Sequence, residues 1–190
     1  SQEAIYLQYY NDAIALDQNY TRVYWTLYQY FYETNVVKSA AYLDKYLKAK
    51  GTDEPNACFL AAQMKYAQGL FAEAITSSDN CIAANPNPYP NLYGVLAYSA
   101  YKLNDSVRAK ASFDMYFQKQ KPAKIGSRDY YTYADVLLKF PGNEALAGTF
   151  VEKAVETGIE NITFLHCHNS EREQVKAERI ARVAVAALKQ

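Results

Sequence analysis

Two histidines and a cysteine lie side by side at His166-Cys167-His168, and these are the only histidines in the sequence. All three side chains are ordinary zinc ligands, but zinc sites usually combine ligands spaced several residues apart. Three consecutive residues cannot readily direct their side chains at one ion, and no CxxC pair elsewhere supplies further ligands. We therefore predict an incidental structural role for this segment and no bound metal.

Signatures of enzyme chemistry are missing from the rest of the sequence. There is no glycine-rich phosphate loop, no GxSxG nucleophile elbow and no HExxH helix. A Cys-His catalytic pair is recognised by its arrangement in space, so sequence alone leaves that alternative open. No residue supports such a pair, and we predict a protein that is not an enzyme and uses no cofactor.

Charge narrows the range of partners. Twenty basic and 20 acidic residues give a formal net charge of zero, whereas nucleic-acid-binding proteins usually carry a basic excess. No apolar run approaches the ~20 residues that span a bilayer. We expect a soluble chain with no nucleic-acid partner and no membrane span. Its compartment, cytoplasmic or periplasmic, is left open.

The segment 55–88 shows most clearly which elements must position any binding residues. It is predicted to form one helix, a turn at Gln68-Gly69, a second helix and an exit at Pro86. Glycine readily adopts the conformation that ends a helix, and proline cannot continue one. Small residues stand where two helices would come close, namely Ala61, Ala62, Ala74 and Cys81.

This segment resembles a tetratricopeptide repeat, a helix-turn-helix unit of about 34 residues. The family pattern has small residues at its eighth and twentieth positions, here Ala62 and Ala74, and the usual fourth-position aromatic is replaced by Cys58. The pattern recurs along the chain, with Tyr24, Tyr93 and Tyr131 at the fourth position of the other units. The turns between paired helices are predicted at Thr34-Asn35, Gln68-Gly69, Asn104-Asp105 and Pro141-Gly142.

The resemblance implies an all-α fold, a right-handed α-solenoid of stacked antiparallel helix hairpins. We expect residues 1–190 to form a single repeat domain. Its expected parts are a half unit at 1–20, units at 21–54, 55–88, 90–123 and 128–161, and a degenerate capping helix region at 162–190.

The half unit at 1–20 matches the second helix of a repeat whose first helix is missing. Tyr6, Tyr10 and Ala13 would then lack a neighbour. We expect that the native chain extends N-terminally, or that a second copy covers this end by self-association. The alternative is a simple capping helix.

Cys58 and Cys81 fall on facing helices of one predicted hairpin. We expect both to be reduced residues of the core, as free cysteines commonly are. A disulfide between them is the alternative, and it would indicate an oxidising compartment.

In the tetratricopeptide family the first helices of successive units line a concave wall that binds peptides or a partner helix. The best-known groove grips a terminal carboxylate with cationic side chains, but Trp25, Gln29, Leu60, Asn91 and Val95 occupy those clamp positions here. Aromatic rings beside amide side chains suit binding of an uncharged or mixed peptide. The alternative is that some of these rings pack between helices and do not bind a partner. The groove residues implied are Arg22, Trp25, Gln29, Asn56, Phe59, Gln63, Asn91, Tyr98 and Tyr133.

The sequence therefore predicts a non-catalytic scaffold that binds a protein or peptide segment in an aromatic and amide-lined groove. The alternative is an accessory repeat domain of a larger envelope, secretion or nutrient-uptake protein whose active part is not in this chain.

Overall fold

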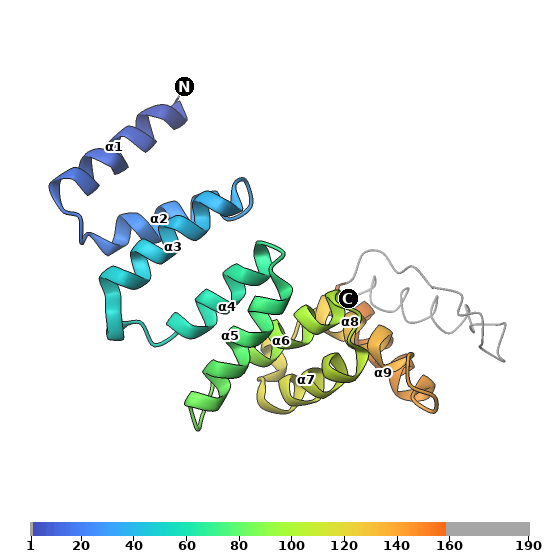
Figure 1. The fold of residues 1–190 in the computed structure, drawn as a ribbon. Coiled ribbons are helices and arrows are strands. Elements are labelled where there is room, and N and C mark those ends of the chain that lie inside the picture. Colours follow the sequence, from blue (N-terminus) through green and yellow to red (C-terminus); the bar gives the residue numbers. More distant parts are fainter. Residues whose placement is uncertain (1, 159–190) are drawn as a thin grey trace. The chain divides into compact units, whose positions relative to one another are not determined.

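The computed structural model describes residues 2–158, and every regular element within them is helical (Figure 1). The predicted metal-free segment at 166–168 and the predicted capping region lie outside the described residues. The elements in chain order are α1 (Gln2–Leu16), α2 (Thr21–Phe31), α3 (Val36–Lys50), η1 (Gly51–Asp53), α4 (Ala57–Ala67), α5 (Phe71–Ala84), α6 (Asn91–Lys102), α7 (Ser106–Lys119), η2 (Pro122–Lys124), α8 (Ser127–Leu137) and α9 (Glu144–Glu156).

Each predicted turn between paired helices falls in the interval between two observed helices. At the turn after α4, the Gly69 N–H donates to the Tyr66 carbonyl and the Leu70 N–H to the Lys65 carbonyl. This is the Schellman arrangement, and it needs the positive φ of 78° that Gly69 adopts. At the turn before α7, Asn104 adopts a φ of 59°, a conformation that asparagine tolerates better than most residues. Local chemistry therefore ends these helices where the sequence predicts.

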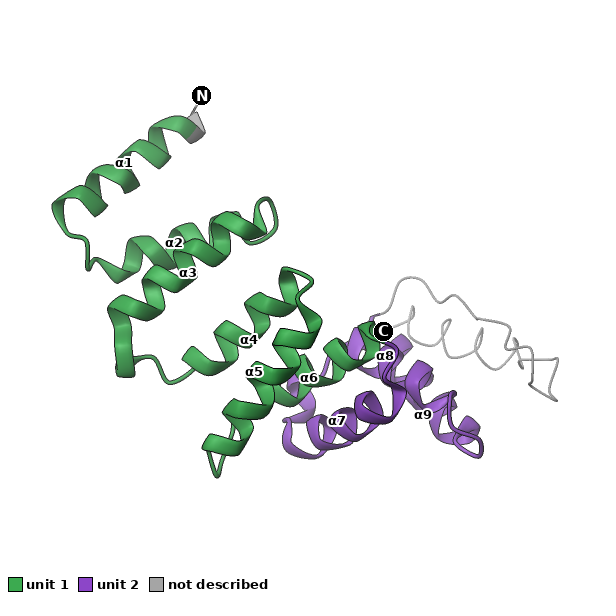
Figure 2. Ribbon diagram, in the orientation of Figure 1, with its two compact units in different colours: residues 1–103 green, residues 104–190 purple. Residues whose placement is uncertain are grey.

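The chain divides into two compact units, residues 1–103 and 104–190 (Figure 2). The predicted grouping into four repeats of one continuous array stays a prediction. In unit 1, α2 pairs with α3, α4 pairs with α5, and α6 packs against α5. Ala62 and Ala74 are fully buried in one cluster with Leu92 and Val95. Small side chains at these two positions let the helix backbones approach closely.

Ala74→Leu should lower the free energy of unfolding by about 1–3 kcal/mol, because extra methylenes in a packed contact force strain. Ala72→Leu is the matched control, since Ala72 is exposed on the same helix α5. Thermal unfolding of both variants tests the prediction. A melting midpoint for Ala74→Leu equal to that of the control would contradict its place in the helix contact.

Helix α1 packs on α2 through one face. Leu7, Tyr10 and Ala13 lie against the buried cluster formed by Val23, Leu27 and Phe31. Tyr10 and Ala13 therefore have neighbours, contrary to the expectation for the half unit, whereas Tyr6 is 56% exposed. The exposed face of α1 carries Ile5, Tyr6, Tyr9 and Leu16. Self-association through this helix stays a prediction.

Unit 2 has a core of aromatic rings from α7, α8 and α9 that contact one another. Phe117 on α7 contacts Tyr133 at 5.0 Å and Phe150 at 5.1 Å between ring centroids. Phe113 is fully buried beside Tyr133. The Tyr133 hydroxyl donates to the Asp114 carboxylate, and burial, followed by this hydrogen bond, raises the pKa of Tyr133 well above its ordinary value. The ring therefore stays neutral and serves packing.

Cys58 at the start of α4 and Cys81 near the end of α5 form a disulfide, with their Cα atoms 5.9 Å apart. The expectation of two reduced core thiols is wrong. Cys58 is exposed while Cys81 is buried. Antiparallel pairing of α4 and α5 brings the first turn of one helix beside the last turn of the other, which places the two residues within bridging range.

Candidate functional site

A hollow of about 510 Å³ lies on unit 1, between the carboxyl-terminal part of α2 and the middle of α4. Two of its lining residues come from α4, and the others belong to α2 and the turn that follows it. The lining consists of aromatic rings, two amides, one carboxylate, one hydroxyl and one aliphatic side chain, from Trp25, Tyr28, Gln29, Tyr30, Tyr32, Glu33, Thr34, Leu60 and Gln63.

Helical spacing explains why these residues share one surface. Trp25, Gln29 and Tyr32 follow one another at i, i+4 and i+7, which places them along one stripe of α2 and its C-cap. The other side of α2 carries Val23 and Leu27, which pack toward α1. Helix α2 also packs against α3, and its stripe of Trp25 and Gln29 lines the hollow together with Tyr28 and Tyr30.

Trp25 is held in place by two tyrosine rings. Its ring centroid lies 5.1 Å from that of Tyr28 and 5.0 Å from that of Tyr46 on α3. Tyr46 is itself fixed, because its hydroxyl donates to the Glu54 carboxylate at 2.6 Å. Burial, with this hydrogen bond, raises the pKa of Tyr46 to about 12. The half-buried indole is therefore packed against two tyrosine rings, and it lines the hollow.

The phenols of the hollow are neutral near pH 7. Burial raises the pKa of the Tyr32 hydroxyl, a hydrogen bond with Gln63 lowers it, and the neighbouring Tyr66 and Glu33 raise it further. Burial also raises the pKa of Tyr28, and the neighbouring Tyr32 raises it further. Glu33 is exposed, and it is the one residue among Asp, Glu, Lys and Arg that lines the hollow.

The structure brings three of the sequence-predicted groove residues together. Trp25 and Gln29 from α2 line the hollow with Gln63 from α4. Arg22 is exposed near the start of α2, outside the lining. Asn56 is the N-cap residue of α4, and its backbone N–H donates to Glu54.

The remaining predicted residues lie elsewhere. Phe59 packs against Tyr89, with ring centroids 5.1 Å apart, and the Asn91 amide donates to the Tyr89 hydroxyl at 3.4 Å. Tyr98 is half-buried with its ring 6.2 Å from that of Tyr66. Tyr133 is 4% exposed in the aromatic core of unit 2. Phe59, Tyr98 and Tyr133 each contact another aromatic ring, and their place in a binding groove stays a prediction.

Sequence reasoning did not select the other rings and the carboxylate of the hollow. Extending the Trp25 and Gln29 stripe by one more turn of helix would have reached Tyr32 and Glu33. Tyr28 had no such signal, because it belongs to the buried residues of α2 although it lines the hollow.

Comparison with known proteins identifies the fold. No family model matches the sequence, and no protein of curated function matches it. Among solved structures, a tetratricopeptide repeat protein from Parabacteroides merdae ATCC 43184 is similar, with a TM-score of 0.61 and 16% sequence identity. The match covers 94% of this chain and 62% of that chain, so this sequence spans less than two thirds of its length.

The fold is thus of the tetratricopeptide-repeat class, an all-α solenoid, and the sequence-based prediction of fold class is confirmed. This class is typical of protein-interaction scaffolds and typically non-catalytic. Across the part of the chain that the structure describes, no helix is long and apolar enough to cross a bilayer. The same residues contain no cluster of three or more side chains suited to holding a metal ion.

Proposed function

We propose that this protein is a non-catalytic scaffold that binds a segment of a partner protein in the hollow between α2 and α4. The observation that supports this proposal is the meeting of Trp25, Gln29 and Gln63 at one surface. These residues come from two helices of different predicted repeats. Their convergence is what a groove formed by successive first helices requires.

The chemistry of the hollow suits a short stretch of polypeptide. Pockets for small ligands and side chains typically have volumes of about 300–1,000 Å³, and the hollow, at about 510 Å³, lies within this range. That volume holds one or two large side chains and not a whole helix. Trp25 offers an apolar anchor of the type that dominates interface energetics. Gln29 can both donate to and accept from a peptide backbone.

Trp25→Ala should weaken binding of a partner segment by about 2 kcal/mol or more, as expected for a central aromatic residue. Peptides selected by display against the wild-type protein would be titrated calorimetrically into both proteins. Tyr20→Ala is the matched control, because Tyr20 is exposed next to α2 and outside the hollow. If no selected peptide depends on Trp25, or if Trp25→Ala unfolds the protein, the hollow is not the binding site.

A second candidate is an accessory repeat domain of a larger envelope, secretion or nutrient-uptake protein. The disulfide between Cys58 and Cys81 favours it, because disulfides persist mainly in oxidising compartments such as the periplasm. The two candidates share the same groove and differ in what the rest of the protein does.

A further inference from the structure

The hollow is lined by one acidic side chain and by no lysine or arginine. Glu33 is the one lining side chain with a full charge at neutral pH, and it is exposed. It follows the last residue of α2, Phe31, by two positions. The carboxyl end of a helix carries partial negative charge on its last carbonyl groups. The carboxylate and the helix end therefore act together on whatever enters the hollow.

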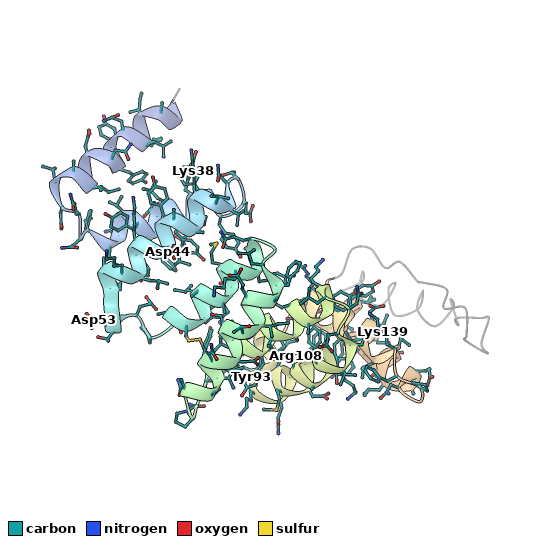
Figure 3. All side chains as sticks on the ribbon, in the orientation of Figure 1. Lys38, Asp44, Asp53, Tyr93, Arg108 and Lys139 are labelled. Carbon is teal, nitrogen blue, oxygen red and sulfur yellow. A yellow bond between two sulfur atoms is a disulfide. The ribbon has the colours of Figure 1, made fainter. Side chains whose placement is uncertain are left out.

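No cation of the described residues neutralises this charge. Within residues 2–158 neither a lysine nor an arginine forms an ion pair with Glu33. Lys38, labelled on α3 in Figure 3, is the cation next along the sequence. Its ammonium group lies 5.1 Å from the centroid of the Phe31 ring instead. The carboxylate is thus available to a charge supplied from outside the unit.

The rings of the hollow also favour a cation. The Trp25 and Tyr28 centroids lie 5.1 Å apart, and those of Tyr28 and Tyr32 lie 5.8 Å apart in an edge-to-face arrangement. Cations are attracted to aromatic faces within about 6 Å of the centroid, most strongly to Trp. The Tyr28 and Tyr32 phenols stay neutral, so neither adds a charge beside Glu33. Trp25 and Tyr32 are half-buried and line the hollow, so part of each ring is exposed there to a bound side chain.

We propose that the hollow accepts the basic side chain of an arginine or lysine in the bound segment, its charged end at Glu33 and its stem across Trp25 and Tyr32. This rests on the proposed function, and it names the chemistry of the partner. An arginine fits best, because its planar guanidinium both stacks on rings and hydrogen-bonds to a carboxylate and to amide oxygens such as that of Gln29. An acidic tail would meet repulsion from Glu33.

Fluorescence offers a direct readout, because Trp25 is the only tryptophan in the sequence. Peptides from a charge-balanced display library are selected against the wild-type protein. The tightest Trp25-dependent peptide is then made in two forms, one with its arginine and one with neutral citrulline in that place. Both are titrated against wild type, Glu33→Gln and the matched control Glu73→Gln, which removes an exposed carboxylate from α5.

We expect the selected peptides to carry a basic residue, and Glu33→Gln to weaken the arginine peptide about tenfold, equivalent to about 1.4 kcal/mol. The citrulline peptide should bind wild type and Glu33→Gln equally, and Glu73→Gln should bind as wild type does. Added salt should weaken binding of the arginine peptide to wild type and to Glu73→Gln. It should not weaken its binding to Glu33→Gln, nor the binding of the citrulline peptide to any of the three proteins.

The outcomes separate the two proposals. Trp25-dependent peptides that lack a basic residue, or that bind Glu33→Gln as tightly as wild type, would overturn the cation site and leave the groove function standing. Failure to select any Trp25-dependent peptide would overturn both. Because Glu33 is exposed and unpaired within the described residues, its replacement should leave the melting midpoint unchanged, which confirms that the variant is folded.

Discussion

Phe113→Ala is expected to cost about 3–5 kcal/mol of the free energy of unfolding, the usual penalty for emptying a buried phenylalanine site. Phe113 is fully buried on α7, with its ring 5.4 Å from Tyr133 and 6.3 Å from Phe117 between centroids. Those rings are held by further contacts with Phe150 on α9. The surrounding rings therefore cannot easily collapse into the space, and the cavity remains.

Urea denaturation followed by circular dichroism measures this loss. Val107→Ala is the matched control, because Val107 lies on the same helix and is 72% exposed. Surface substitutions of that kind usually change stability by less than about 0.5 kcal/mol. A Phe113→Ala midpoint that matches the control would show that the aromatic rings do not form the core of unit 2.

Replacing Cys58 and Cys81 together by serine is expected to lower the free energy of unfolding by about 3 kcal/mol, because the disulfide no longer restricts the unfolded chain. The two cysteines are 23 residues apart in the sequence, so the bridge closes a loop of moderate length. It also joins the far ends of α4 and α5, which the Gly69 turn connects at the opposite end. The hairpin that carries Gln63 is therefore closed at both ends.

Thermal unfolding with and without a reductant tests this prediction in the wild-type protein, and the double serine variant should match the reduced form. Cys167→Ser is the control, since it leaves both members of the bridge in place. Alkylation before reduction should label one cysteine of the wild-type chain. Labelling of all three, or a midpoint insensitive to reductant, would contradict the bridge.

Tyrosine has two roles in this chain, which contains 19 of them. At the edge of the core, the ring is buried while the hydroxyl finds a partner, as in Tyr24, which donates to the Gln18 carbonyl at 2.8 Å. Tyrosine suits this position because it combines a large apolar ring with a polar end. At the hollow, the same combination lets the ring of Tyr32 line the surface while its hydroxyl hydrogen-bonds with Gln63. Composition alone does not separate the two roles.

The amino-acid sequence was sufficient for the helical hairpins. Gly69 ends α4 through a backbone conformation that few other residues adopt, and the small side chains at Ala62 and Ala74 allow close helix packing. These are local and short-range effects, so the types and spacing of a few residues predict them. The stripe of Trp25 and Gln29 follows from the same helical periodicity.

Three features required the folded chain. The disulfide depends on how closely the ends of α4 and α5 approach each other. Residue types alone do not decide whether two facing cysteines are reduced or bridged. The burial of Tyr133 depends on Phe150, which reaches it from α9 across a turn. The hollow depends on the approach of Gln63 on α4 to α2 and to Glu33 in the turn that follows it. Each of these features brings together segments that are distant in sequence, and side-chain packing decides which of several compatible helix faces meet.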